Sequence, residues 1–197
     1  MNSIERLAEI FKTFPGIGPR QAKRFVYYLL SRNGSYSEEL IKAIQDLKKE
    51  VAQCQSCQRH FVGKNKICSI CSEENRDNSL LMIVPRDIDL ESVEKSGSFN
   101  GHYFVLGGIV PVLDKEPEKK IRISKLETRI KEDKNLKEII LAMNANQDGE
   151  HTAEYLKERL KDFQLVTSEL GRGLSTGAEL EYADPETLKN ALKNRSK

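Results

Sequence analysis

Four cysteines between positions 54 and 71 are the side chains of this sequence best suited to bind a metal ion. They form two Cys-x2-Cys pairs, Cys54 with Cys57 and Cys68 with Cys71. Such a turn directs both sulfurs toward one tetrahedral ion, usually Zn²⁺. Four thiolates leave no coordination position for a reactive water, so the spacing predicts one structural Zn²⁺ per chain. A redox-active pair or a disulfide is the alternative, and His60 is expected to lie outside the ligand set.

A glycine-containing turn near the N-terminus could bind phosphate. Residues 14–19 read Phe-Pro-Gly-Ile-Gly-Pro and join two segments with helical periodicity, in a turn expected to need both glycines. Glycine lets backbone N–H groups approach a phosphate closely, and the dipole of the following helix favours an anion there. Such a contact carries no sequence information. The pattern is typical of a helix-hairpin-helix motif, and an ordinary solvated helical hairpin is the alternative.

Basic side chains flank this turn on the second predicted helix. Arg20, Lys23, Arg24 and Tyr27 have the spacing of one helical face, opposite the apolar positions. Residues 10–37 contain no acidic residue, although the chain as a whole is nearly balanced, with a net charge of +2. The sequence therefore predicts a local cationic patch that binds nucleic acid. The expected DNA contacts are Gly16, Gly18, Arg20, Lys23 and Arg24.

Two carboxylates, Asp148 and Glu150, follow a predicted strand at 138–143. They could share a hard cation such as Mg²⁺, or they could complement the dipole at the start of the next helix. The predicted strand at 80–84 carries no glutamate at its end that could act as a general base or third ligand. A metal-dependent phosphoryl-transfer centre is therefore hard to assemble, and we expect a binding surface instead.

Other catalytic patterns are absent from the sequence. It has no P-loop motif, and the histidines at 60, 102 and 151 stand outside any triad context. The glycine-spaced segment 171–177 is interpreted as a flexible turn or a subunit-contact loop. No apolar run is long enough to span a membrane, and the first residues are charged, which predicts a cytoplasmic protein without membrane contact.

Apolar periodicity indicates the elements that position these groups. Helical spacing extends through the first 53 residues, with a break at Asn33-Gly34 and a third helix expected over 37–53. Beyond residue 77, runs of strand length alternate with helical patterns. This alternation favours a mainly parallel sheet with functional residues at the C-terminal ends of its strands. The segment 107–122 is expected to be a charged, exposed loop, and Asp184-Pro185 should start a last helix.

These patterns together predict an α+β chain of several modules. The expected modules are a helix-hairpin-helix DNA-binding region at 1–53, a four-cysteine zinc finger at 54–76, an α/β domain at 77–170 and a helical C-terminal tail at 171–197.

The order of these modules resembles the RecR recombination-mediator family over nearly the whole chain. The resemblance rests on residues 14–19, the two cysteine pairs, 103–108, 139–144 with 148–150, and 172–173 with 179–182. It implies that 77–170 is a Toprim domain and that the tail makes a subunit contact. It also implies a non-enzymatic DNA-repair factor that works with RecO, and in some pathways RecF, to load recombinase on single-stranded gaps.

The resemblance further implies residue roles and an assembly. Arg20 and Arg24 match basic residues that contact DNA in the family, and Asp148 and Glu150 match acids implicated in the RecO contact. The chain would form a homodimer or a tetrameric ring of dimers, with its hairpins facing single- or double-stranded DNA. The glutamate that usually ends the first Toprim strand is missing at 83–85, where this chain reads Ile-Val-Pro.

Two other classes of function are weighed against the mediator. A Mg²⁺-dependent Toprim nuclease or primase-like enzyme would need Asp148 and Glu150 for strand chemistry, and the missing glutamate argues against it. A zinc-stabilised interaction module would keep every activity after charge reversal at Arg20 and Arg24. A mediator instead predicts salt-sensitive DNA binding with little sequence preference and no turnover.

Overall fold

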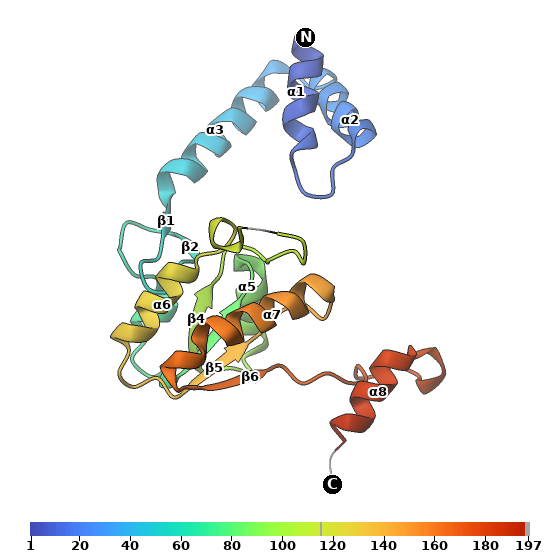
Figure 1. Cartoon of the computed structure of the whole chain (residues 1–197). Coiled ribbons are helices and arrows are strands. Elements are labelled where there is room, and N and C mark those ends of the chain that lie inside the picture. The colour runs from blue at the N-terminus through green and yellow to red at the C-terminus, as the bar shows by residue number, and fades with distance from the viewer. Residues whose placement is uncertain (115, 196–197) are drawn as a thin grey trace. The chain divides into compact units, whose positions relative to one another are not determined.

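The computed structural model describes residues 1–114 and 116–195 (Figure 1). Lys115, which belongs to the predicted loop, and residues 196–197, which belong to the predicted tail, lie outside the described residues. Contacts between residues divide the chain into two units, Met1–Val51 and Ala52–Lys197.

The first unit is helical. It contains α1 (Ser3–Lys12), α2 (Pro19–Leu30) and α3 (Gly34–Glu50). Ala8 of α1 packs against Ala22 and Val26 of α2 in a small apolar core, as the helical periodicity predicts.

The helix predicted over 37–53 is shifted at both ends. The preceding helix α2 does not reach Asn33: it ends at Leu30, with Ser31 as its C-cap. The Asn33 side chain instead accepts a hydrogen bond from the Tyr36 N–H (3.2 Å) and caps α3, which therefore begins at Gly34. At the other end, Val51–Gln53 forms the strand β1.

The second unit begins with the cysteine segment. Strand β1 pairs with β2 (His60–Val62), and the short helix α4 (Ser69–Ser72) carries the last cysteine. These elements are small and bury few apolar side chains of their own. Their arrangement therefore depends on the cysteine cluster and on the neighbouring sheet.

A parallel sheet forms the centre of the second unit. Its strands are β3 (Asp77–Val84), β4 (Gly101–Val105), β5 (Glu138–Leu141) and β6 (Val166–Glu169), in the order β4-β3-β5-β6. Every neighbouring pair in this sheet is parallel, which confirms the sequence prediction. The connections contain α5 (Asp87–Ser96), α6 (Ile123–Glu132) and α7 (Gln147–Leu160) (Figure 1).

Alternate residues of the central strand β3 face different cores. Leu81 and Ile83 are buried with residues of α6 and α7, whereas Met82 and Val84 are buried with Leu90 of α5. This alternation is the two-residue period of a strand. The core on the α5 side also includes three of the cysteines, so the cysteine segment is packed against this face of the sheet.

The segment 107–122 is less exposed than its charge suggests. Val110 is fully buried, and its N–H donates to Thr152 Oγ1 of α7 (2.9 Å). Ile121 is also buried, next to the short 3-10 helix Pro117–Lys119. The expectation of an exposed loop is wrong at these two apolar positions, because they complete the core under α7.

The chain ends in a helical tail. A 3-10 turn at Leu180–Tyr182 precedes α8 (Pro185–Lys193), and Asp184 Oδ1 accepts the Glu186 and Thr187 N–H groups. The predicted helix start is thus confirmed. Within the described residues, the helices are too short or too polar to cross a membrane.

Candidate nucleic-acid interface and metal centre

The hairpin between α1 and α2 depends on one glycine for its backbone conformation. Gly16 has a φ of +76°, in the left-handed region that favours glycine. Gly18 has a φ of −83°, and a Cβ added there would meet nothing within 4 Å. The expectation that the turn needs both glycines is therefore wrong for Gly18. The open space around Gly18 is instead available to a molecule that approaches from outside.

The start of α2 leaves backbone donors free. The first backbone hydrogen bond runs from the Ala22 N–H to the Gly18 carbonyl (2.9 Å), and within the described residues no side chain caps this end. Pro19 has no N–H, so the N–H groups of Arg20 and Gln21 are the unpaired donors of this helical turn. Together with the helix dipole they form an environment that favours an anion.

The basic side chains beside this helix start are exposed. Arg20, Lys23 and Arg24 all lie on the solvent side of α2. Among the described residues, no carboxylate lies within ion-pair distance of any of them, and Arg24 donates only a long hydrogen bond to Gln21 Oε1 (3.4 Å). Their charges are therefore available to phosphate groups.

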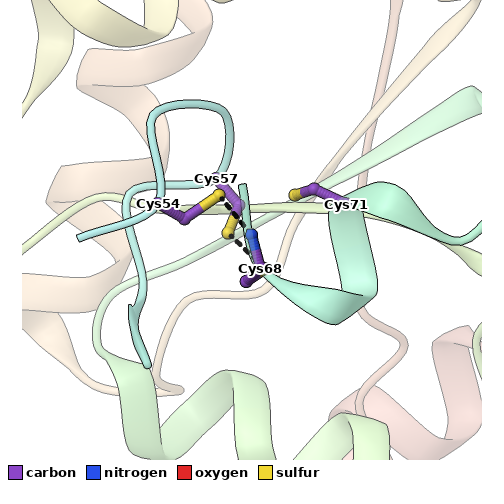
Figure 2. A group of neighbouring side chains, drawn as sticks. All are labelled: Cys54, Cys57, Cys68 and Cys71. Atoms are coloured by element: carbon purple, nitrogen blue, oxygen red, sulfur yellow. Dashed lines mark hydrogen bonds between the residues drawn. The ribbon is translucent and has the colours of Figure 1, made fainter. Parts of the chain in front are cut away.

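The four cysteines gather as their spacing predicts. Their sulfurs all lie within 4.8 Å of one another, and this is the only metal-competent cluster in the described part of the chain (Figure 2). Cys57 Sγ and Cys68 Sγ are 3.6 Å apart. Zn–S bonds of about 2.3 Å in a tetrahedron place sulfurs about 3.8 Å apart, so the geometry fits this ion. The Cys68 N–H also donates to Cys54 Sγ (3.4 Å), as outer-shell donors do around bound thiolates.

The crowding of the thiols changes their acidity. The pKa of Cys54 lies far below its ordinary value, chiefly because Cys57 and then Cys68 and Cys71 hydrogen-bond to its sulfur. The same contact with Cys54 raises the pKa of Cys57. Four thiols in this arrangement cannot all lose their protons at little cost, and a divalent cation would compensate the accumulated charge.

Hydrogen bonds tie the cysteine segment to the sheet. The Cys57 carbonyl accepts the Val105 N–H of β4 (2.8 Å). The next residue, Gln58, has a φ of +63°, and its carbonyl accepts from Arg122 Nη1 (3.3 Å) while its side-chain Oε1 accepts from Lys125 Nζ (2.9 Å). No motif in the sequence indicates Gln58 or Arg122. The hydrogen bonds that Gln58 accepts from Arg122 and Lys125 come from residues more than sixty positions later in the chain. Patterns of nearby residues therefore cannot predict these contacts.

The two predicted acids lie where β5 leads into α7, and each already has a partner. Asp148 Oδ1 accepts the Val112 N–H (3.3 Å), and Glu150 forms an ion pair with Arg172 of the tail. Within the described residues, these acids do not join a third ligand in a metal-competent group. The strand β3 ends at Val84 and is followed by Pro85, so neither its last residue nor the next one is an acid.

Each of the three histidines has a ring nitrogen within hydrogen-bond distance of a partner, and the three partners differ. His60 lies outside the cysteine cluster, with Nδ1 3.3 Å from Asp87 Oδ2. His102 Nε2 is 2.9 Å from Asn78 Oδ1, and His151 Nδ1 is 3.1 Å from the Val110 carbonyl. None of these three partners is a hydroxyl or thiol nucleophile.

Comparisons with known protein families match the two ends and the middle of the chain. Three family models match this chain: "RecR, helix-hairpin-helix" at residues 4–48, "Toprim domain" at 79–170 and "RecR, C-terminal" at 173–196.

Similar full-length proteins carry one name. "Recombination protein RecR" of Bifidobacterium adolescentis is 38% identical over 98% of this chain and 95% of its own length. Proteins with the same name from Legionella pneumophila (34% identical, 100% of this chain and 97% of their own) and Staphylococcus saprophyticus (36%, 98% and 96%) are also similar. With such identity over nearly its whole length, the chain belongs to the RecR family of recombination proteins.

Proposed function

We propose that this chain is a recombination mediator in DNA repair that binds the sugar-phosphate backbone through its helical hairpin. Its relatives are named recombination proteins, and the helix-hairpin-helix, Toprim and C-terminal family models match it in that order. The observation that carries the proposal is the juxtaposition of free N–H donors at the start of α2 with exposed, unpaired cations on the same helix. Both groups favour phosphate, and neither reads a base.

Each residue of the hairpin has a distinct role in this proposal. Gly16 supplies the turn, and Gly18 leaves room for a phosphate beside the N–H groups of the helix start. Arg20, Lys23 and Arg24 project from the solvent side of α2 and neutralise the neighbouring phosphates. DNA of any sequence, single- or double-stranded, would satisfy these contacts.

Charge reversal tests the hairpin. We expect Arg20→Glu combined with Arg24→Glu to weaken DNA binding at least about tenfold and to flatten its salt dependence, because cations that release counterions are lost. Fluorescence anisotropy over a series of salt concentrations would measure both effects. Since both side chains are exposed, the circular dichroism of the variant should match that of the original chain.

The matched control is Lys42→Glu combined with Lys49→Glu. Both lysines are exposed on α3 of the same helical unit, and the formal charge changes by the same amount. This control should bind DNA much as the original chain does. Equal affinity of the hairpin variant and the original chain at low salt would remove the hairpin from the DNA interface.

We propose that Cys54, Cys57, Cys68 and Cys71 together hold one structural Zn²⁺ per chain. The close approach of the four sulfurs and the N–H donor to Cys54 support a closed thiolate site. When bound, the ion would fix the cysteine segment and supply no reactive water. The chain's own residues Gln58 and Arg122 would then hold this module on the sheet.

We infer that the Toprim domain of this chain binds partners and does not cut or join strands. Asp148 and Glu150 are engaged with Val112 and Arg172, and the end of β3 offers no acid to complete a metal site. In this proposal the two acids form the contact surface for RecO, with RecF as a further partner in some pathways.

We also propose that the chain works as a homodimer or a ring of dimers. Within the described residues, α3 buries none of its side chains, and its apolar stripe is exposed to solvent. The stripe contains Leu40, Ile41, Ile44 and Leu47. A second copy of the chain that covers this stripe would remove a sizeable apolar surface from water.

A further inference from the structure

The outward face of α2 alternates cations with aromatic rings. Arg20, Arg24 and Tyr28 follow one another at intervals of four residues, and Arg32 continues the row just past the end of the helix. Lys23 and Tyr27 form a second row at the same spacing. Side chains four residues apart are neighbours on a helix surface, so each tyrosine lies beside a basic side chain.

The two tyrosines are much more exposed than aromatic residues of a core. Tyr27 is 59% exposed and Tyr28 is 44% exposed, whereas the buried side of α2 is formed by Ala22 and Val26. The core of the helical unit therefore does not account for either ring. An exposed aromatic ring beside free cations is a surface on which another planar group can stack.

Neighbouring side chains hold the Tyr28 ring in place. The Arg32 guanidinium lies 4.5 Å from its centroid, and Arg32 Nη2 donates to its hydroxyl (2.7 Å). The Tyr36 ring meets Tyr28 edge-on, with centroids 6.1 Å apart and an interplanar angle of 84°. These contacts fix the orientation of the ring, so a further stacking partner would cost little additional side-chain entropy.

The surrounding charge selects an anionic partner. Residues 10–37 contain five basic and no acidic residues, and the described structure shows no ion pair at Arg32. A single nucleic-acid strand alternates phosphates with planar bases, which is the same alternation as cations and rings on α2. In a duplex the bases are stacked on one another, so only the phosphates would find partners on this face.

We propose that Tyr27 and Tyr28 stack on unpaired bases, so that the helical unit prefers single-stranded DNA to duplex DNA. In this arrangement Arg32 and Tyr36 act as positioning residues for Tyr28. The proposal rests on the proposed DNA binding by the hairpin and adds a contact to bases, which the hairpin by itself does not make.

The test separates bases from phosphates. The original chain and two double variants, Tyr27→Ala with Tyr28→Ala and Tyr27→Phe with Tyr28→Phe, would be titrated with an oligothymidylate and with an abasic oligonucleotide of equal length. We expect the original chain to bind the oligothymidylate at least about fivefold more tightly, which corresponds to about one stacked base. The alanine variant should bind the two strands equally, with its abasic affinity unchanged, and the phenylalanine variant should keep the preference.

The outcomes distinguish this inference from the function on which it rests. An alanine variant that keeps the preference, or an original chain that binds both strands equally, would overturn the stacking alone, provided that Arg20→Glu with Arg24→Glu still weakens binding at least about tenfold. Failure of the original chain to bind either strand would overturn both proposals. If the double alanine variant lost helical content, Tyr27→Ala alone would give the same comparison, because the exposed Tyr27 ring contributes little to the core.

Discussion

At the scale of single residues, the two glycines of the hairpin have different physical tasks. Gly16 is required by its positive φ, whereas Gly18 adopts a conformation open to any residue and has free space beside its Cα. Sequence spacing treats the two alike, because both belong to the same Gly-x-Gly pattern. Only the backbone angles separate a glycine that shapes the fold from one that keeps a surface accessible.

Alanine at each position should therefore give opposite results. Gly16→Ala should lower the free energy of unfolding by about 1 kcal/mol, since a side chain is strained in the left-handed region. Gly18→Ala should leave stability nearly unchanged and reduce DNA affinity, because its methyl group occupies the space proposed for a phosphate. Thermal unfolding and anisotropy with one oligonucleotide would measure both quantities. A Gly18→Ala protein that binds DNA normally would argue against a phosphate at this position.

At the scale of elements, the cysteine segment and the sheet stabilise each other. The Cys57 carbonyl pairs with the edge strand β4 at Val105, and three of the cysteines belong to the core beneath α5. The proposed zinc is therefore expected to protect more than its own loop. The outer edge of β4 pairs with the cysteine segment, and the proposed ion would hold that segment in place. This pairing should therefore depend on the ion.

Zinc removal should loosen this edge first. Metal analysis of freshly reduced protein should find about one zinc per chain, and Cys68→Ser should lower this content. After chelation, hydrogen exchange at the Val105 amide should accelerate, whereas the Ile140 amide in the inner strand β5 should stay protected. Uniform acceleration across the whole sheet would contradict the local coupling, and protein without zinc would contradict the metal assignment.

Sequence patterns predicted those elements whose signal is local. The cysteine pairs, the strand runs and the start of α8 depend on spacing within a few residues, and the structure confirms them. The ion pair between Glu150 and Arg172 and the burial of Val110 depend on distant parts of the chain. The Asn33-Gly34 pair predicts a helix end, whereas α2 already ends at Leu30 and Asn33 caps α3, because an Asn side chain is equally suited to the start of a helix.

At the scale of the whole molecule, the distribution of charge matters more than its sum. A net charge of +2 would attract DNA weakly, yet the stretch without acids at 10–37 concentrates positive charge in one unit. The same unit exposes the apolar stripe of α3. Binding of DNA and proposed association with a second copy are therefore assigned to the same helical region.

A charge placed in the apolar stripe tests this association. Ile44→Glu should lower the molar mass measured by light scattering at a fixed concentration, because a buried carboxylate without a partner would oppose the contact. Lys42→Glu, also exposed on α3, is the control and should leave the mass unchanged. An Ile44→Glu protein of unchanged mass would show that α3 does not join the copies.

The glycine between the two Toprim acids limits how this corner of the molecule can vary. A Cβ on Gly149 would lie 2.0 Å from the Asn144 carbonyl oxygen, so any larger residue would displace the start of α7. Asp148 and Glu150 thus project from a fixed frame. Arg172 of the tail reaches this frame through its side-chain ion pair with Glu150, so exchange of Arg172 would release the Glu150 carboxylate for another partner.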